Sequence, residues 1–228
     1  MARKTKEDAL KTRTRILASA LALFSKKGYD RTTFNDIAAR LKLTKGAVYW
    51  HFESKEKLLV ELVRLALAKF RRQIESVMPD GELTFPAVAD MMVRNAIQLV
   101  EDPKGVAFFR LMKCQIRWGD ESMAEVRTKL LTNEDYGPKE AFRRAIVNDI
   151  AAGRARASVD VEEVSAVAIA LWDGLVQMRL DHFLAGDLAS TLMHSYEAIW
   201  QGIEAGSEPL VMKVLNEGKT SNKKGKAK

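Results

Sequence analysis

Two short amphipathic segments between residues 33 and 52 limit the possible folds of this chain more than any other feature. In the first segment, apolar side chains recur at the i, i+3, i+4, i+7 spacing that puts them on one side of a helix: Phe34, Ile37, Ala38 and Leu41. Thr33, followed three residues later by Asp36, matches the pattern of a capping box that begins such a helix. The spacing therefore predicts a short helix of about two turns.

The second segment follows after only Lys42 and Leu43. Thr44 can cap a helix with its hydroxyl, and Val48 and Phe52 supply an apolar side that can pack on the first helix. Two short helices joined by so short a turn are typical of a helix-turn-helix, whose second helix enters the DNA major groove.

The other side of this second helix carries residues suited to a phosphate-rich ligand: Lys45, Gly46, Tyr49, Trp50 and His51. Tyr49 and His51 can hydrogen-bond phosphate oxygens, and Lys45 adds positive charge. Gly46, which has no Cβ, lets a backbone approach closely. The aromatic pair can equally be half-buried packing residues. The predicted DNA-binding site consists of these five residues with Thr33, Thr44 and Lys55, the last at the positive end of the following helix.

At these residues the sequence also resembles a known family. The stretch TKGAVYWHFESKEKLL, preceded by RTRILASALALFSKKGYDRTTFNDIA, resembles the amino-terminal domain of the TetR family of bacterial transcriptional regulators, and YWHF is most similar to its AcrR-type branch. The resemblance covers about the first 65 residues. It implies an all-α protein in which a three-helix DNA-binding domain is joined by a long helix to a larger helical domain for ligand binding and dimerisation.

The resemblance also implies a function. A homodimeric repressor would bind a palindromic double-stranded DNA operator and leave it when a small lipophilic ligand binds, and the AcrR-type branch suggests control of a multidrug efflux system. The alternative is a DNA-binding regulator of the same fold whose carboxy-terminal domain responds to a protein partner or to no ligand.

The distribution of charge agrees with a DNA-binding amino-terminal domain. Residues 1–57 hold 14 Lys and Arg against 6 Asp and Glu, a balance of +8, whereas residues 58–212 carry a balance of −6. Residues 213–228 carry +5. Basic charge concentrated on one part of a chain is an electrostatic footprint for nucleic acid.

Helical stripes and capping residues divide the rest of the chain. A first helix, whose stripe includes Leu10, is expected to end at Gly28, with Arg3, Lys4 and Lys6 before it as a possible minor-groove arm or a disordered terminus. Ser54 is expected to cap a long helix over 54–77. Further helices are expected at 85–101, 103–118, 121–133, 138–152, 161–184 and 187–205.

These elements predict three parts: a DNA-binding domain at 1–57, a helical ligand-binding and dimerisation domain at 58–212, and a basic tail at 213–228. The tail is expected to be disordered, and its lysines either add nonspecific DNA affinity or keep the protein soluble.

Polar amides interrupt two of the predicted apolar stripes, at Asn95 and Gln115. Polar groups within walls of Met and aromatic residues are typical of a small-molecule pocket, although each amide can instead bond a neighbouring backbone group in a filled core. The predicted ligand-binding residues are Phe70, Ile74, Met91, Asn95, Phe108, Met112, Gln115, Trp118 and Trp172.

The last two long helices carry apolar stripes that include Leu171, Leu175, Leu192 and Ile199. The resemblance assigns these helices to a four-helix dimer interface, while packing within one subunit explains the stripes equally well.

No residue pattern supports an enzyme. None of His51, His182 and His194 has the Glu three residues earlier that a carboxylate-bridged metal site requires, and the sequence has no HExxH, GxxxxGK[ST] or GxGxxG motif. We therefore expect no catalytic residue, metal or cofactor. The single cysteine, the lack of an 18-residue apolar run and the polar amino terminus predict a cytoplasmic protein without a membrane partner.

Overall fold

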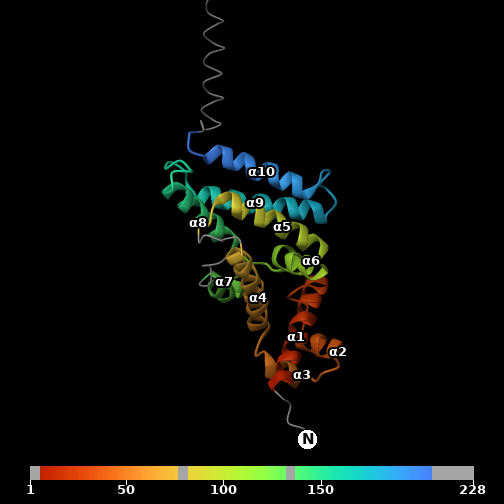
Figure 1. Ribbon diagram of the computed structural model, residues 1–228. Helices are drawn as coiled ribbons and strands as arrows, with labels where there is room; N and C mark the ends of the chain where they lie inside the picture. The colour runs from red at the N-terminus through yellow and green to blue at the C-terminus, as the bar shows by residue number, and fades with distance from the viewer. Residues whose placement is uncertain (1–5, 77–81, 132–136, 207–228) are drawn as a thin grey trace, which may run out of the picture. The chain divides into compact units, whose positions relative to one another are not determined.

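The computed structural model describes residues 6–76, 82–131 and 137–206. Over these ranges the chain is helical, and its β-structure is limited to an isolated bridge between Ala155 and Glu204. The prediction of an all-α fold is confirmed (Figure 1). The α-helices are α1 (Lys6–Lys27), α2 (Phe34–Leu41), α3 (Lys45–His51), α4 (Lys55–Ser76), α5 (Phe85–Glu101), α6 (Pro103–Arg110), α7 (Ala124–Leu131), α8 (Pro138–Ala151), α9 (Val161–Leu180) and α10 (Leu188–Ile203).

The described residues divide into two compact units, 6–72 with 98–131 and 73–76 with 82–97 and 137–206. This division does not follow the predicted boundary after residue 57. The reason is that the segment after α5 returns to the first unit and buries four apolar side chains in its core: Leu111, Ile116, Met123 and Val126. Helix α4 supplies residues 55–72 to the first unit and 73–76 to the second.

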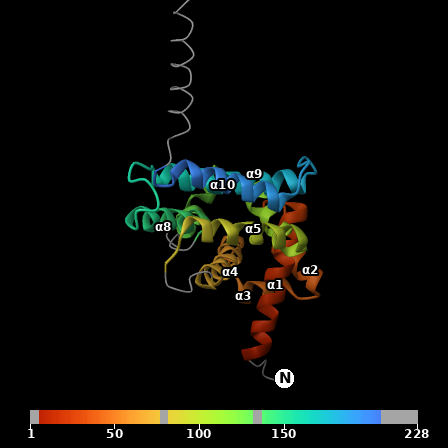
Figure 2. The same ribbon diagram turned by 45° about the horizontal axis from the view of Figure 1, so that its top comes forward.

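In the first unit, α1 packs against α2, and α2 packs against α3 (Figures 1 and 2). The predicted stripe of α1 is buried at Ile16, Leu17, Ala20 and Phe24, but Leu10 is 59% exposed and does not belong to it. The helix ends at Gly28, whose φ of +97° suits glycine. Lys6 is the first described residue of α1 and is therefore not part of a preceding arm; Arg3, Lys4 and the basic tail lie outside the described residues.

The predicted helix over 103–118 begins as expected and ends earlier. Asp102 caps it by accepting from the Lys104 amide at 3.0 Å, with Pro103 in the first turn. A π-helical turn, η1 (Leu111–Gln115), follows, and the backbone then becomes extended at Ile116. Because Ile116 is buried in the core of the first unit, the chain leaves the helical path there, and the predicted end at residue 118 was wrong.

The second unit has an aromatic core built by α5, α8 and α10. The ring centroids of Phe85 and Phe142 are 5.2 Å apart, and those of Phe142 and Tyr196 are 5.4 Å apart. The fully buried carboxylate of Asp149 accepts from the Phe85 amide and from Arg154 Nε, both at 2.7 Å. A buried charge that is paired and hydrogen-bonded in this way holds the end of α8 to the start of α5.

Helix α9 packs against α8 on one side and α10 on the other, and Figures 1 and 2 both show α9 and α10 side by side. Asp160 caps α9 by accepting from the Glu163 amide at 3.0 Å, as predicted. The helix stops at Leu180 instead of residue 184, because His182 takes a left-handed conformation with φ of 61°.

Candidate nucleic-acid interface

Helix α2 begins with the predicted capping box. The Asp36 amide donates to Thr33 Oγ1 at 3.2 Å, and Asp36 Oδ2 accepts from the Thr33 amide at 2.8 Å. Lys27 at the end of α1 also donates to Asp36 Oδ1 at 2.8 Å. The bond from Lys27, followed by those from Thr33, holds the pKa of the Asp36 carboxyl well below its usual range. The start of α2 is therefore tied to the end of α1 through one ionised side chain.

The turn between α2 and α3 is tight and closed by backbone bonds. Lys42 adopts a left-handed conformation with φ of 56°, and the Leu43 amide donates to the Ala38 carbonyl at 2.9 Å. Thr44 then caps α3 by accepting from the Ala47 amide at 3.1 Å. This turn fixes the angle at which α3 leaves α2, so the orientation of α3 is set by local chemistry.

Helix α3 is anchored on one side and exposed on the other. Val48 and the adjacent Phe52 are buried in the core of the first unit. Trp50 is 73% exposed and Tyr49 47% exposed. Tyr49 is nevertheless steadied by an edge contact with Phe34, with ring centroids 4.7 Å apart. These exposures favour a binding role for the pair over the packing role considered from the sequence.

The structure thus brings Lys45, Gly46, Tyr49 and Trp50 onto one exposed helix. Lys45 Nζ lies 5.5 Å from the centre of the Tyr49 ring, which keeps the ammonium beside the aromatic side chain. A Cβ placed on Gly46 would meet only Thr44 Oγ1, at 4.0 Å. The protein itself therefore does not require glycine at this position.

Two other predicted DNA-binding residues already have structural roles. The hydroxyls of Thr33 and Thr44 cap α2 and α3. A hydroxyl is both donor and acceptor, so the Thr44 oxygen that accepts from Ala47 still carries a proton that can be donated to a phosphate.

Lys55 lies at the start of α4, where Ser54 Oγ accepts from the Lys57 amide at 3.2 Å and caps the helix as predicted. Lys55 Nζ donates to the carbonyls of Tyr29 at 2.9 Å and Asp30 at 3.2 Å. The expected phosphate-binding lysine therefore also holds the segment between α1 and α2 against α4.

Sequence reasoning missed Arg13 on α1. Its Nη1 donates at 2.9 Å to the carbonyl of His51, the last residue of α3 and 38 positions away in the chain. The available signal was spacing, because Arg13 precedes Ile16 and Leu17 by three and four residues and so lies beside the buried stripe of α1.

The predicted ligand-binding residues fall into both compact units. Phe70, Phe108, Met112, Gln115 and Trp118 belong to the first, and Ile74, Met91, Asn95 and Trp172 belong to the second. In the first unit, Phe108, Met112 and Trp118 pack against the core that supports the helix-turn-helix. The structure therefore does not gather the predicted ligand-binding residues within one unit.

The polar groups among these residues have partners of their own. Asn95 Nδ2 donates to Gln73 Oε1 at 3.0 Å, and the indole of the buried Trp172 donates to the Met92 carbonyl at 2.9 Å. The indole of Trp118 donates to the Met112 carbonyl at 2.7 Å. Asn95 thus pairs with a second side-chain amide instead of a backbone group.

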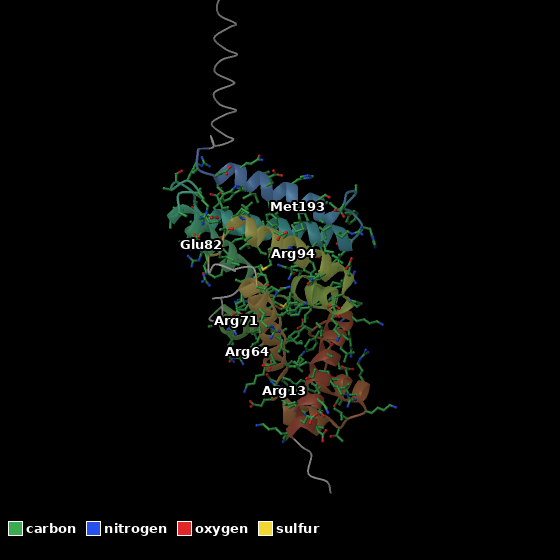
Figure 3. All side chains as sticks on the ribbon, viewed as in Figure 1. Arg13, Arg64, Arg71, Glu82, Arg94 and Met193 are labelled. Carbon is green, nitrogen blue, oxygen red and sulfur yellow. The ribbon has the colours of Figure 1, made fainter. Side chains whose placement is uncertain are left out.

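On the predicted apolar stripe of α10, Leu188 and Leu192 are buried in their own chain, whereas Ile199 is half-buried. Leu192 is fully buried there, so its prediction as a dimer-interface residue was wrong. The large apolar side chains exposed on these two helices are Val167 (49%) and Met178 (42%) on α9 and Met193 (58%) on α10, the last labelled in Figure 3. Leu171 and Leu175 on α9 are half-buried.

Within residues 6–76, 82–131 and 137–206, no group of three or more His, Cys, Asp or Glu side chains is arranged to hold a metal ion. None of the helices in these ranges combines the length and apolar character needed to cross a membrane.

Known proteins share this amino-terminal unit. The family of bacterial regulatory proteins called the tetR family matches residues 16–62, from the middle of α1 into α4. The probable acrEF/envCD operon repressor of Escherichia coli (strain K12) is 28% identical over 192 residues, which are 82% of this chain and 84% of that repressor. The HTH-type transcriptional regulator AcrR of Shigella flexneri is 47% identical over 66 residues, 29% of this chain and 31% of AcrR.

A solved structure extends the likeness to the whole fold. SmeT in complex with triclosan has a TM-score of 0.71 and 23% sequence identity, covering 86% of this chain and 93% of SmeT. SmeT is the repressor of the Stenotrophomonas maltophilia multidrug efflux pump SmeDEF. With its capped helix-turn-helix, the segment 16–62 matches the tetR family of bacterial regulatory proteins, and the chain is similar to the AcrR-type transcriptional regulators of that family.

Proposed function

We propose that this protein is a homodimeric repressor that binds a palindromic operator through α3 and leaves it when a small lipophilic ligand binds. The observation that carries the proposal is the exposed side of α3, where Tyr49 and Trp50 stand in solvent beside Lys45 on a helix held by caps at its start. A rigid helix with an aromatic and basic surface suits the major groove and its flanking phosphates.

The dimer is proposed because one seven-residue helix reads few base pairs. Two copies related by a twofold axis would present two such helices to half-sites about 34–36 Å apart on B-DNA. The exposed apolar side of α9, with Val167 and Met178, and the neighbouring Met193 supply a surface for the second copy. Gly174 on the same helix has open space around its Cα, which allows a partner helix to approach.

The ligand is proposed to act through α4, which is one continuous helix shared by both compact units. Its first turn contains Lys55, which bonds the segment before α2, and its last turns contain the buried Phe70 and Ile74. A ligand that shifts the end of this stiff element would change the spacing of the two reading helices. The AcrR-type relatives, and the triclosan complex of SmeT, favour lipophilic compounds and an efflux operon as the target. A repressor of this kind would act in the bacterial cytoplasm.

An alternative retains the DNA-binding role and replaces the small molecule with a protein partner. Phe183, three residues after the end of α9, is 77% exposed and offers an apolar contact to such a partner. Titration with lipophilic compounds distinguishes the two functions, since saturable quenching of Trp118 or Trp172 fluorescence supports the ligand.

The central test is operator binding. DNA upstream of the genes that neighbour this one should contain a palindrome bound by the protein, and Tyr49→Ala and Lys45→Ala should each weaken binding while leaving the helical content unchanged. Loss of one phosphate contact should reduce the slope of log affinity against log salt by about 0.9. If both variants bind the palindrome as tightly as the parent, the reading surface has been misplaced.

Induction is tested separately through its thermodynamic reciprocity. If a ligand weakens operator binding, saturating operator must weaken ligand binding by the same factor, typically about 5–150-fold. Equal ligand affinities with and without operator would refute release by this route and leave the operator-binding role intact.

A further inference from the structure

A recess of about 300 Å³ lies where α1, the end of α3 and α4 meet, and Arg13 forms part of its wall. Arg13 Nη1 donates to the His51 carbonyl at 2.9 Å, and its guanidinium carbon lies 4.2 Å from the centre of the Phe52 ring. Its Nη2 is 3.3 Å from Glu61 Oε1 on α4. One side chain of α1 (labelled in Figure 3) thus contacts the last residue of α3, its C-cap and α4.

These contacts act where α3 is weakest. The last four carbonyls of a helix have no partner within it, and a helix of two turns has little stability of its own. A guanidinium at that end satisfies a carbonyl and also opposes the negative end of the helix dipole. The start of α3 is fixed by Thr44, and Arg13 provides the matching attachment at its other end.

The geometry also accounts for arginine at this position. A planar guanidinium can lie flat on an aromatic ring while its N–H groups bond two acceptors at its edge, whereas an ammonium is a point charge that cannot do both. Glu61, with its side chain only 24% exposed, provides a third contact for the guanidinium of Arg13, whose own side chain is 34% exposed. All three contacts of the guanidinium are made with groups of the protein itself.

We propose that Arg13 is a positioning residue for operator reading, which sets the angle of α3 without contacting DNA itself. The proposal rests on the proposed role of α3 in reading DNA. It gives Glu61 a secondary part, because loss of that carboxylate frees the guanidinium to rotate away from His51 and Phe52.

The test compares operator affinity with affinity for a nonspecific duplex of the same length. Loss of folded protein lowers both affinities equally, whereas a tilted α3 lowers only the operator affinity, because nonspecific binding depends mainly on charge. Arg13→Ala should reduce the ratio of the two affinities about tenfold, equivalent to about 1.4 kcal/mol. Arg13→Lys should recover only part of that ratio.

The matched control is Leu23→Ala, which removes a half-buried side chain of α1 that packs on the same core and does not touch the recess. It should lower the unfolding midpoint and leave the affinity ratio unchanged. Glu61→Gln, which retains Arg13, should reduce the ratio a few-fold and provides the decisive variant if Arg13→Ala does not fold.

Two results would overturn the assignment. An affinity ratio in Arg13→Ala and Glu61→Gln equal to that of the Leu23→Ala control would mean that Arg13 has a structural role only. A salt slope reduced by about 0.9 in Arg13→Ala would mean that Arg13 contacts a phosphate directly. Failure of the parent protein to bind any specific duplex would instead refute the proposed function, and the assignment of Arg13 with it.

Discussion

The ammonium group of Lys55 lies 4.6 Å from the centre of the Tyr29 ring and donates to the carbonyl of the same residue at 2.9 Å. Tyr29 is itself buried against Phe24, and burial, followed by the nearby Glu56 carboxylate, raises the pKa of its phenol. Lys55 therefore joins α4 to the segment that follows α1 in two ways. Its ammonium group makes a cation–π contact with the Tyr29 ring and a hydrogen bond to the Tyr29 carbonyl.

Lys55→Gln tests whether this lysine also meets DNA. An ammonium has three donors, and the carbonyls of Tyr29 and Asp30 use two of them, so one can be donated to a phosphate. We expect the variant to lose about 1 kcal/mol of folding stability. We also expect its operator-binding salt slope to fall by about 0.9, measured by fluorescence anisotropy. An unchanged slope with reduced stability would mean that Lys55 acts only within the protein.

Gly46→Ala separates the requirements of the protein from those of DNA. A Cβ at Gly46 has room in the protein, and alanine is a better helix former than glycine by up to about 1 kcal/mol. We expect the variant to unfold at a higher urea concentration and yet bind operator more weakly, because the methyl group would meet the DNA backbone. Unchanged operator affinity would remove Gly46 from the DNA-binding site.

Asp36→Asn tests the capping box through pH. The folded protein holds the pKa of Asp36 below its unfolded value of about 3.9. The ionised carboxylate therefore stabilises the fold fully above that value, and its contribution is lost as pH falls further through the folded pKa. Urea unfolding should find the parent more stable than the variant at neutral pH, with the difference shrinking below about pH 4. A difference independent of pH would show that the charge is not responsible.

Met178→Asp tests the proposed dimer surface. Because Met178 is exposed on α9, the variant should fold. Dimerisation would then bury the unpaired aspartate charge at this position, which is strongly unfavourable. Sedimentation should show monomers at concentrations where the parent is dimeric. Val147→Asp, an equally exposed apolar position on α8, should remain dimeric. A dimeric Met178→Asp protein would place the interface elsewhere.

The sequence allowed accurate prediction of helix starts, which are determined by local chemistry. Thr33, Thr44, Ser54 and Asp160 all cap helices as their positions indicated, because a cap depends on residues within three or four places in the chain. Helix α5 begins at its predicted start after Thr84, and α8 begins at Pro138, a residue suited to the first turn of a helix.

Features that depend on distant partners were not predicted. The contact of Arg13 with His51 spans 38 residues, and the early end of α6 follows from burial of Ile116 in the core of another part of the chain. The stripe of α10 was visible in the sequence, but periodicity does not say which neighbour covers it. Leu192 was therefore assigned to a partner subunit when its own chain buries it.

The return of residues 98–131 to the first unit limits how readily this regulator can be recombined with its relatives. A chimaera that joined its residues 1–72 to the remainder of another regulator would leave behind Leu111, Ile116, Met123 and Val126. The core of the transplanted segment would then contain cavities where these four side chains normally pack, because the other regulator does not supply them. The part of the protein proposed to select the operator is therefore encoded by two separate segments of the gene. An exchange that preserves folding must move both segments together.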